Sequence, residues 1–311
     1  MLQLIRSDLN IDFIRWRTPA MVFSGAIMLI GILSLILKGG PNYGIDFAGG
    51  LLVHVRVDPA VKIEEVRQVA DSTQVGAISV QQFESQPGEY LLRVPTADES
   101  MGGGIAATLK NGLRAAFASK GFEELRTEMV GPQVGKDLRR RAVLAVLFAT
   151  LVMGIYIAVR FEFWFGVGAA VALFHDVLVV IGALSLNNVE VDLTILAALL
   201  TVVGYSVNDT VVVSDRIREN MRKDKRTPMA KLINDSLNQT LSRTILTGGT
   251  TFMVLIVLFL YGGGTIHGFA FTLIVGLLIG TYSSIFIASP VVEMWSGERN
   301  EAAGAVATRN R

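Results

Sequence analysis

Six long apolar runs limit what this chain can fold into more than any other feature of its sequence. A transmembrane helix needs about 20 apolar residues, because each residue adds about 1.5 Å to a path through a hydrocarbon core about 30 Å thick. Only 18% of the residues are charged, whereas soluble domains carry about a quarter. We therefore predict an α-helical polytopic membrane protein with six transmembrane helices, at residues 20–37, 142–159, 163–186, 193–214, 244–261 and 268–290.

Residues 39–141, which follow the first predicted span, form the one sizeable polar region. Its apolar periodicity predicts strands at 50–57, 77–84, 89–94 and 122–130, with helices at 62–72 and 105–119. This β-α-β-β-α-β order is typical of a ferredoxin-like α+β domain. The glycine-rich stretch 98–104 is predicted to be a mobile loop. An extended polypeptide could add to the sheet as a further strand, at 50–57 or 77–94.

The placement of lysine and arginine predicts how the chain is oriented in the membrane. Cytoplasmic connections carry an excess of these residues. The connections 187–192 and 262–267 contain none, whereas the predicted loop 215–243 is rich in both. We therefore expect this basic loop to be cytoplasmic and the domain between the first two spans to be extracytoplasmic.

The same reasoning places both termini in the cytoplasm. The N-terminal segment 1–19 and the tail 291–311 would lie there, and the composition of the tail predicts partial disorder. The arginines at 139–141 oppose this orientation, since they abut the second span on its outer side. Long translocated domains largely escape the charge rule, so we keep the assignment.

Composition excludes several classes of function. The chain has no cysteine and only three scattered histidines, so we expect neither a metal site nor a cofactor. A net charge of +1 gives no support for nucleic-acid binding. No GxxxxGK[ST] sequence is present to bind nucleotide phosphates. The chain also lacks the GxGD and GxSxG sequences of intramembrane aspartyl proteases and serine hydrolases, and we predict that it is not an enzyme.

Asp209 is the first candidate functional residue, because it lies within the predicted fourth span. An aspartate at the centre of such a helix costs roughly 2.5–3.5 kcal/mol on insertion scales, so it is a functional-site hypothesis by default. Tyr205 and Ser206 precede it by four and three residues and share its helix face. We expect a carboxylate that binds a proton or an ion; the alternative is a buried structural hydrogen bond.

Arg243 is the predicted partner of Asp209. It lies at the inner end of the fifth span, which runs antiparallel to the fourth, so the two side chains can meet at a similar depth. Protonation of the aspartate would then free the arginine, as in a proton switch. The alternative for Arg243 is a contact with lipid phosphate.

His175 and Asp176 are adjacent ionisable residues in the predicted third span. They could relay protons towards Asp209. Alternatively, they point about 100° apart on a helix and each bonds a different neighbour. The sixth span carries small residues at every fourth position, which predicts close helix packing; these are Gly276, Gly280, Ser284 and Ala288.

Four stretches carry a resemblance to a known family. They are residues 43–50 (Tyr-Gly-Ile-Asp-Phe-Ala-Gly-Gly), 130–135 (Val-Gly-Pro-Gln-Val-Gly), 174–177 (Phe-His-Asp-Val) and 204–220, which begins Gly-Tyr-Ser-Val-Asn-Asp. Together they resemble the SecF family of protein-export membrane subunits, within the resistance–nodulation–division (RND) superfamily. The motif residues of the first stretch are Gly44, Asp46, Gly49 and Gly50.

The resemblance implies a role and a set of partners. It implies a multi-pass protein of the bacterial inner membrane that forms a pseudo-symmetric twelve-helix bundle with SecD. The pair would bind the SecYEG channel, often with YajC and YidC. It would use the proton motive force for late, ATP-independent translocation and release of preprotein. The alternatives are an RND-type solute exporter subunit and a structural scaffold of the translocon.

The resemblance also implies roles for particular residues. Asp209 and Arg243 match the aspartate and arginine that matter for proton transport in this family. Asn208 lies about 100° round the helix from Asp209 and is a candidate to face SecD.

Overall fold

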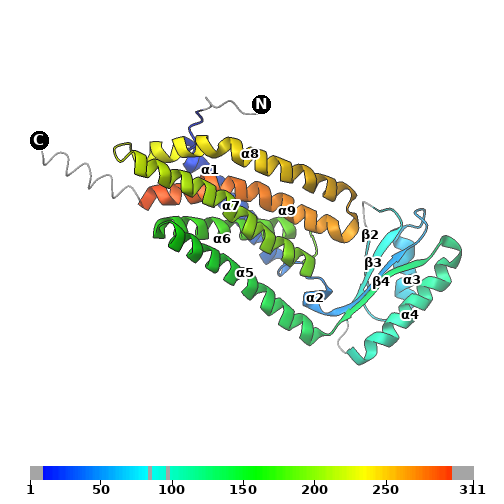
Figure 1. Ribbon diagram of the computed structural model, residues 1–311. Helices are drawn as coiled ribbons and strands as arrows, with labels where there is room; N and C mark the ends of the chain where they lie inside the picture. The colour runs from blue at the N-terminus through cyan, green and yellow to red at the C-terminus, as the bar shows by residue number, and fades with distance from the viewer. Residues whose placement is uncertain (1–9, 83–85, 96–98, 296–311) are drawn as a thin grey trace, which may run out of the picture.

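A long helix bundle with a small α+β domain at one end makes up the molecule (Figure 1). The computed structural model describes residues 10–82, 86–95 and 99–295. Within these ranges, six helices are long and apolar enough to cross a membrane, which confirms the predicted number. Both ends of the described chain lie at the end of the bundle away from the small domain (Figure 1). The predicted tail beyond residue 295 lies outside the described residues.

Helix α6 has the predicted bounds, and the other five helices of the bundle are longer than the predicted spans. A short 3-10 turn, η1 (Ile14–Trp16), precedes the first helix, and the π-helical segment η3 (Ser284–Ala288) continues the last one, which extends to Trp295. The six helices are α1 (Arg17–Lys38), α5 (Pro132–Arg160), α6 (Phe163–Leu186), α7 (Leu193–Lys223), α8 (Met229–Tyr261) and α9 (Gly263–Ser283).

The predicted basic loop at 215–243 is wrong in its extent. Helix α7 continues to Lys223 and α8 begins at Met229, so residues 224–228 alone connect them. The continuation keeps a helical pattern, since Glu219 forms ion pairs with Arg216 one turn before it and Lys223 one turn after it. The basic residues from Arg216 to Lys223 therefore belong to a helix rather than to a loop.

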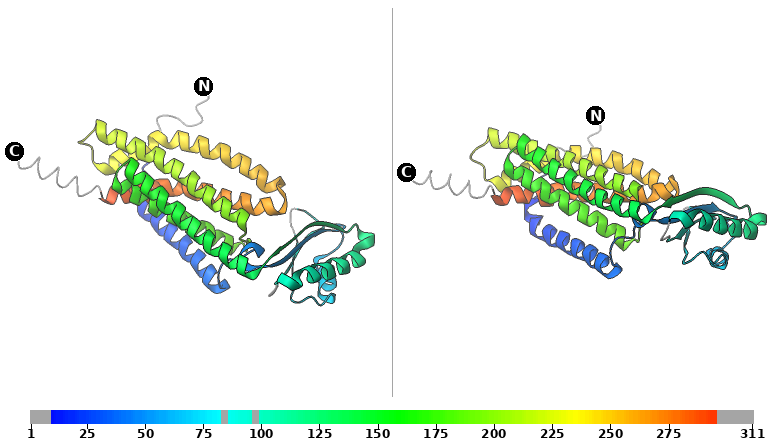
Figure 2. Two further views of the ribbon diagram at one scale, coloured as in Figure 1. Left: turned by 60° about the horizontal axis from the view of Figure 1, so that its bottom comes forward. Right: turned by 90° about the horizontal axis from the view of Figure 1, so that it is seen from below.

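Helices α6, α7 and α9 form the centre of the bundle, and α1, α5 and α8 lie outside them (Figure 2). The outer helices expose large apolar side chains such as Phe23, Phe148 and Val254, as expected of surfaces that face lipid or another subunit. Close approach of α9 to α7 depends on Gly280, where an added Cβ would lie 3.0 Å from the Ser206 Cβ. This contact confirms the close packing predicted from the small residues.

The small domain is a four-stranded antiparallel sheet with two helices on one face. Its strand order is β2-β3-β1-β4. The side chains of Leu51, Val53 and Val55 alternate into a core closed by Leu109 and Leu113 of the second helix. In chain order the elements are β1 (Gly50–Arg56), α3 (Ile63–Ser72), β2 (Ser79–Gln82), β3 (Glu89–Val94), α4 (Glu99–Phe117) and β4 (Glu123–Val130).

Two expectations for this domain are corrected. Helix α4 begins at Glu99 and includes the glycines predicted to lie in a mobile loop, while residue 98 lies outside the described residues. A helical glycine costs about 1 kcal/mol relative to alanine, and packing of this helix on the sheet offsets that cost. Strand β1 pairs on both sides, with β3 and β4, so no chain can add at 50–57; the edges are β2 and β4.

A short segment joins the first transmembrane helix to the sheet. It contains the single helical turn α2 (Ile45–Ala48) and ends at Gly49, whose φ of 77° favours glycine. A Cβ at this position would lie 2.8 Å from the Cα of Pro132, the first residue of α5. The two sequence motifs at 43–50 and 130–135 therefore pack against each other at the start of the second span.

Candidate functional site

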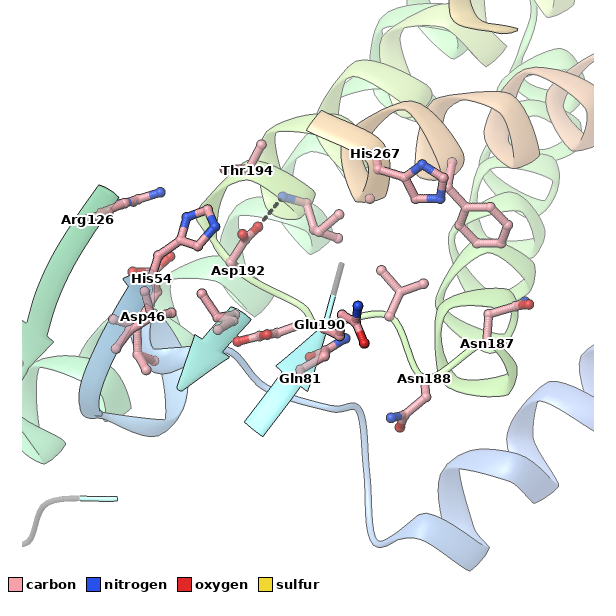
Figure 3. Close-up of a pocket in the computed structure, with 18 of the residues that line it drawn as sticks. Asp46, His54, Gln81, Arg126, Asn187, Asn188, Glu190, Asp192, Thr194 and His267 are labelled. Atoms are coloured by element: carbon pink, nitrogen blue, oxygen red, sulfur yellow. Dashed lines mark hydrogen bonds between the residues drawn. The ribbon is translucent and has the colours of Figure 1, made fainter. Parts of the chain in front are cut away.

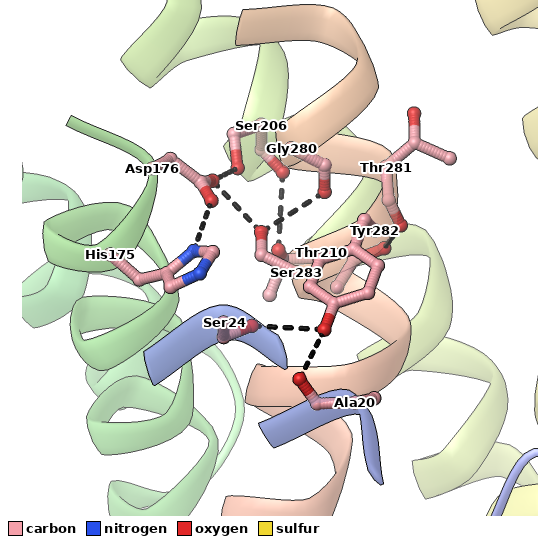
Figure 4. Close-up of polar contacts among 11 residues, drawn as sticks. Ala20, Ser24, His175, Asp176, Ser206, Thr210, Gly280, Thr281, Tyr282 and Ser283 are labelled. Carbon is pink, nitrogen blue, oxygen red and sulfur yellow. Dashed lines mark hydrogen bonds and ion pairs between the residues drawn. The ribbon is translucent and has the colours of Figure 1, made fainter. Parts of the chain in front are cut away.

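A cluster of buried polar side chains lies where α6, α7 and α9 meet (Figure 4). At its centre is the carboxylate of Asp176, which is 1% exposed. Asp176 Oδ2 accepts hydrogen bonds from Ser206 Oγ at 2.6 Å and Ser283 Oγ at 2.8 Å. The Nδ1 atom of His175 lies 3.0 Å from Asp176 Oδ1. Each of the three helices thus contributes a partner, as a buried carboxylate requires.

The contact between His175 and Asp176 corrects the expectation that they bond different neighbours. The 100° between adjacent residues describes their Cβ directions, whereas the imidazole and carboxylate extend far enough to turn towards each other. His175 Nε2 is buried and has no hydrogen-bond partner among the described residues. The imidazole ring lies against the ring of Tyr282, with centroids 6.3 Å apart.

Asp209 lies on α7, one turn beyond Ser206, and is 3% exposed. Its Oδ2 accepts a hydrogen bond from Thr281 Oγ1 of α9 at 3.3 Å. The predicted hydroxyl neighbours do not bond it: Ser206 donates to Asp176 instead, and the buried hydroxyl of Tyr205 has no partner among the described residues. Helix α9 thus occupies the side of α7 that carries Asp209.

Arg243 does not form an ion pair of 4 Å or less with Asp209 or with any other carboxylate in the described residues. It lies exposed on α8, close enough to Asp209 for electrostatic attraction at longer range. Asn208 is also exposed, on the adjoining face of α7. The predicted direct contact between Asp209 and Arg243 is therefore absent here, and the hydrogen bond to the Asp209 carboxylate comes from Thr281 of α9.

Sequence reasoning missed the hydroxyl donors of α9. Thr281 and Ser283 each bond one of the two buried aspartates. The available signal was the run Thr-Tyr-Ser-Ser at 281–284 inside an otherwise apolar helix. The π-helical segment η3 starts directly after Ser283, and π-helical turns occur frequently at functional sites.

Further hydroxyl groups continue from the cluster towards the C-terminal end of α7. They line a narrow cavity between α7 and η3, together with apolar side chains such as Phe165 and Ile217. The hydroxyl residues are Thr210, Ser214, Ser284 and Ser289. The buried carboxylates are therefore bordered by groups that can hydrogen-bond to water or to a proton carrier.

A larger cavity of ≈ 740 Å³ lies between the open face of the sheet and the nearby ends of α6 to α9 (Figure 3). His54, Arg126, Asp192 and His267 are among its lining residues. Burial lowers the pKa of His54, although Glu89 at 3.0 Å opposes this shift. Burial raises the pKa of Asp192, opposed by the hydrogen bond from the Ile195 amide.

The motif residues Gly44, Asp46, Gly49 and Gly50 lie at the junction of the domain and the bundle. The Gly44 amide donates to Val191 O at 2.8 Å, and the two later glycines join α2 to β1. The described residues contain no group of three or more side chains suited to hold a metal ion.

Six spans and two carboxylates buried among the central helices define a multi-pass membrane protein of the transporter class, since ionisable groups inside a bundle mark proton or ion paths. The family model described as "Protein export membrane protein SecD/SecF, C-terminal" matches residues 110–298. A second model, the "SecD/SecF GG Motif", matches residues 34–61. The chain belongs to the SecD/SecF family of protein-export membrane proteins, in its SecF branch.

Individual relatives agree with this placement. "Protein translocase subunit SecF" of Vibrio alginolyticus is 42% identical over 293 residues, covering 93% of this chain and 91% of the relative. The protein of the same name from Magnetococcus marinus is 44% identical over 309 residues, covering 98% and 99%. These relatives are named as translocase subunits, a transport role rather than an enzymatic one.

Two solved structures are similar to this fold. The crystal structure of SecDF, a translocon-associated membrane protein from Thermus, matches with a TM-score of 0.82 and 36% identity over 94% of this chain. SecDF in a super-membrane-facing form matches with a TM-score of 0.67 and 36% identity over 96%. The chain covers 40% of the length of each of these SecDF chains.

Proposed function

We propose that this SecF-type subunit works with SecD to convert the proton motive force into late, ATP-independent translocation and release of preprotein across the bacterial inner membrane. The observation that carries the proposal is the burial of Asp176 and Asp209 among the central helices. Carboxylates at this depth are costly, and a proton path is the function that such groups most often serve.

The proton motive force supplies enough free energy to shift the outer domain between two positions. One elementary charge that crosses a potential of 100 mV releases about 2.3 kcal/mol. To move a two-state equilibrium from 1:99 to 99:1 takes about 5.5 kcal/mol, so a few protons can shift the position of an outer domain.

A SecD partner follows from two polar side chains on the outside of the bundle. Asn208 and Arg243 are exposed on α7 and α8, and a polar group facing hydrocarbon is unfavourable. The spans of SecD would cover them and complete a twelve-helix bundle, in which Arg243 acts with Asp209 in proton transport. In the cell this pair would be attached to SecYEG, with YajC and YidC.

The orientation and the outer domain belong to the same proposal. The basic residues at the ends of α7 and α8 favour a cytoplasmic position for this end of the bundle, and with it both termini. The βαββαβ domain, ferredoxin-like in element order, would then be extracytoplasmic. Its edge strands, β2 and β4, are where an emerging polypeptide could add.

The test is Asp209→Asn in the complete complex, with preprotein translocation into inverted membrane vesicles as the readout. We expect at least a tenfold loss of the gradient-dependent part of translocation. Asp215→Asn is the matched control, because Asp215 is an exposed aspartate on the same helix. Wild-type translocation in Asp209→Asn would refute the proposal and favour a structural scaffold.

A second measurement identifies the coupling ion. Translocation is followed in vesicles that hold a sodium gradient while the proton gradient is collapsed. We expect the gradient-dependent part of preprotein translocation to disappear when the proton gradient is collapsed. Its persistence would show that sodium, and not the proton, drives this subunit.

A further inference from the structure

The outer end of α7 is capped by two carboxylates, and one of them comes from a distant part of the chain. Asp192 Oδ1 accepts a hydrogen bond from the Ile195 amide at 2.8 Å, as an ordinary N-cap does. Asp46 Oδ2 accepts one from the amide of Leu193, the first residue of α7, at 2.9 Å. Asp46 belongs to the single turn α2, directly before the sheet of the outer domain.

Main-chain hydrogen bonds strengthen this connection. The Gly44 amide donates to Val191 O at 2.8 Å, and the Val191 amide donates to Asn42 O at 2.7 Å. The Asn42 side-chain amide also donates to Asn188 O at 3.2 Å. The motif segment before β1 and the connection before α7 are thus joined by an isolated parallel β-bridge between Tyr43 and Val191.

The sheet itself supplies a second connection. Arg93 of β3 forms an ion pair with Glu190 of the connection between α6 and α7, and both side chains are less than one-fifth exposed. Burial lowers the pKa of Arg93, and the nearby Asp192 opposes this shift. Removing one member of such a pair leaves a poorly solvated charge, which costs several times more than loss of an exposed pair.

These contacts end on the helix that carries the buried site. Helix α7 holds Ser206, which bonds Asp176, and Asp209 one turn further on. A helix transmits displacement along its axis because its backbone hydrogen bonds keep it stiff. The contacts from the outer domain therefore reach the end of the helix whose later turns carry Ser206 and Asp209.

We propose that Asp46 and Arg93 are positioning residues that couple the outer domain to the proton site through α7. Asp46 holds the outer end of the helix, and Arg93, through Glu190, fixes the angle of the sheet over the cavity. This inference rests on the proposed function, and it assigns a task to the motif at residues 43–50.

The first test reverses the ion pair in the full complex reconstituted in vesicles. Proton uptake and preprotein translocation are measured on the same preparation for Arg93→Glu, Glu190→Arg and the double variant. We expect each single variant to lower translocation per proton at least fivefold while proton uptake persists. The double variant should recover at least half of the wild-type ratio.

The matched control is Lys120→Glu, which breaks an exposed ion pair between Lys120 and Glu65 within the outer domain. It should leave the ratio unchanged. If the single reversals keep the wild-type ratio, the coupling role of Arg93 is refuted. If the double variant stays as impaired as the singles, the pair does not act through its mutual attraction.

The second test measures the position of the domain directly. Spin labels at Gln68→Cys on α3 and Leu186→Cys on α6, both exposed, report the distance between domain and bundle. We expect Asp46→Ala to broaden the distance distribution, and Asp46→Asn, whose side-chain oxygen still accepts a hydrogen bond, to broaden it less. An unchanged distribution in Asp46→Ala would overturn the role of Asp46. The spin-label distance tests the role of Asp46 and does not depend on proton coupling. Unimpaired export in Asp209→Asn would instead refute the proposed function and leave the role of Asp46 in positioning the domain intact.

Discussion

Three polar side chains, one each from α6, α7 and α9, hold the carboxylate of Asp176. Ser206 and Ser283 donate to its Oδ2 atom, and His175 Nδ1 lies 3.0 Å from its Oδ1 atom. Hydroxyl groups are suited to this task, because a hydroxyl rotates to follow either a charged or a neutral carboxyl group. At the scale of single residues, the two hydroxyl groups can therefore bond Asp176 in either of its protonation states.

Ser283→Ala tests the cost of losing one of these donors. We expect the free energy of unfolding in detergent to fall by about 0.6–3 kcal/mol, between the average for an interhelical hydrogen bond in a membrane protein and that for a bond to a charged group. Denaturation by increasing dodecyl sulfate measures it. Thr250→Ala is the control, because that hydroxyl bonds only its own helix. Equal losses in the two variants would show that Ser283 contributes no interhelical bond.

We expect His54 to make the small domain sensitive to acid. Burial lowers its pKa below the ordinary 6.5, with Arg126 and Arg56 adding to the shift and Glu89 opposing it. Because the folded state then binds a proton less readily than the unfolded chain, stability is full above about pH 6.5 and is lost as the pH falls towards the folded pKa.

Hydrogen exchange of the β1 and β3 amides between pH 5 and 8, corrected for intrinsic rates, checks this expectation. Wild type should lose protection below pH 6.5, and His54→Gln should flatten the dependence. His267→Gln, which alters a histidine outside the sheet, should keep the wild-type slope. A steep dependence that persists in His54→Gln would assign the acid sensitivity to another group.

Two elements, α7 and α9, form the interface on which the site depends. Gly280 lets α9 approach so closely that Ser206 and Ser283 reach the same oxygen of Asp176. Directly after Ser283, the π-helical segment widens the helix and turns Ser289 towards Ser284, where its hydroxyl bonds the carbonyl oxygen at 2.8 Å. The geometry of the cluster is thus a property of helix packing, not of one side chain.

Gly280→Leu tests this interface. The added side chain must push α9 away from α7, and overpacking of this kind typically costs 1–3 kcal/mol. We expect a lower unfolding temperature and loss of gradient-dependent translocation. Gly249→Leu on α8 is the control, since a Cβ there meets nothing within 4 Å. Normal translocation in Gly280→Leu would mean that the close approach is dispensable.

On the scale of the whole molecule, one side of the bundle exposes polar side chains next to the buried site. Arg243 and Asn208 are exposed beside a site whose carboxylates are fully enclosed by this chain. A partner that covers this face of α7 and α8 would contact Asn208 and Arg243 directly and would lie beside the enclosed carboxylates.

A photoreactive amino acid at position 208 checks which protein covers this face. We expect crosslinks to SecD in membranes that contain the complete complex. The same probe at Leu37, which is 85% exposed at the end of α1, should label SecD at most one-tenth as well. Labelling that is no stronger at 208 than at 37 would place the partner on another face.

Local properties of the sequence determined the number of spans, the order of elements in the small domain and the candidate carboxylates. Each depends on hydrophobicity or on residue type within one segment, so reading along the chain is enough. Tertiary structure decided that Ser206 bonds Asp176 rather than Asp209, that Thr281 takes the place expected of Arg243, and that Asp46 caps α7. Those contacts join residues far apart in sequence, and the rotation and approach of each helix, which decide them, follow from packing of the whole bundle.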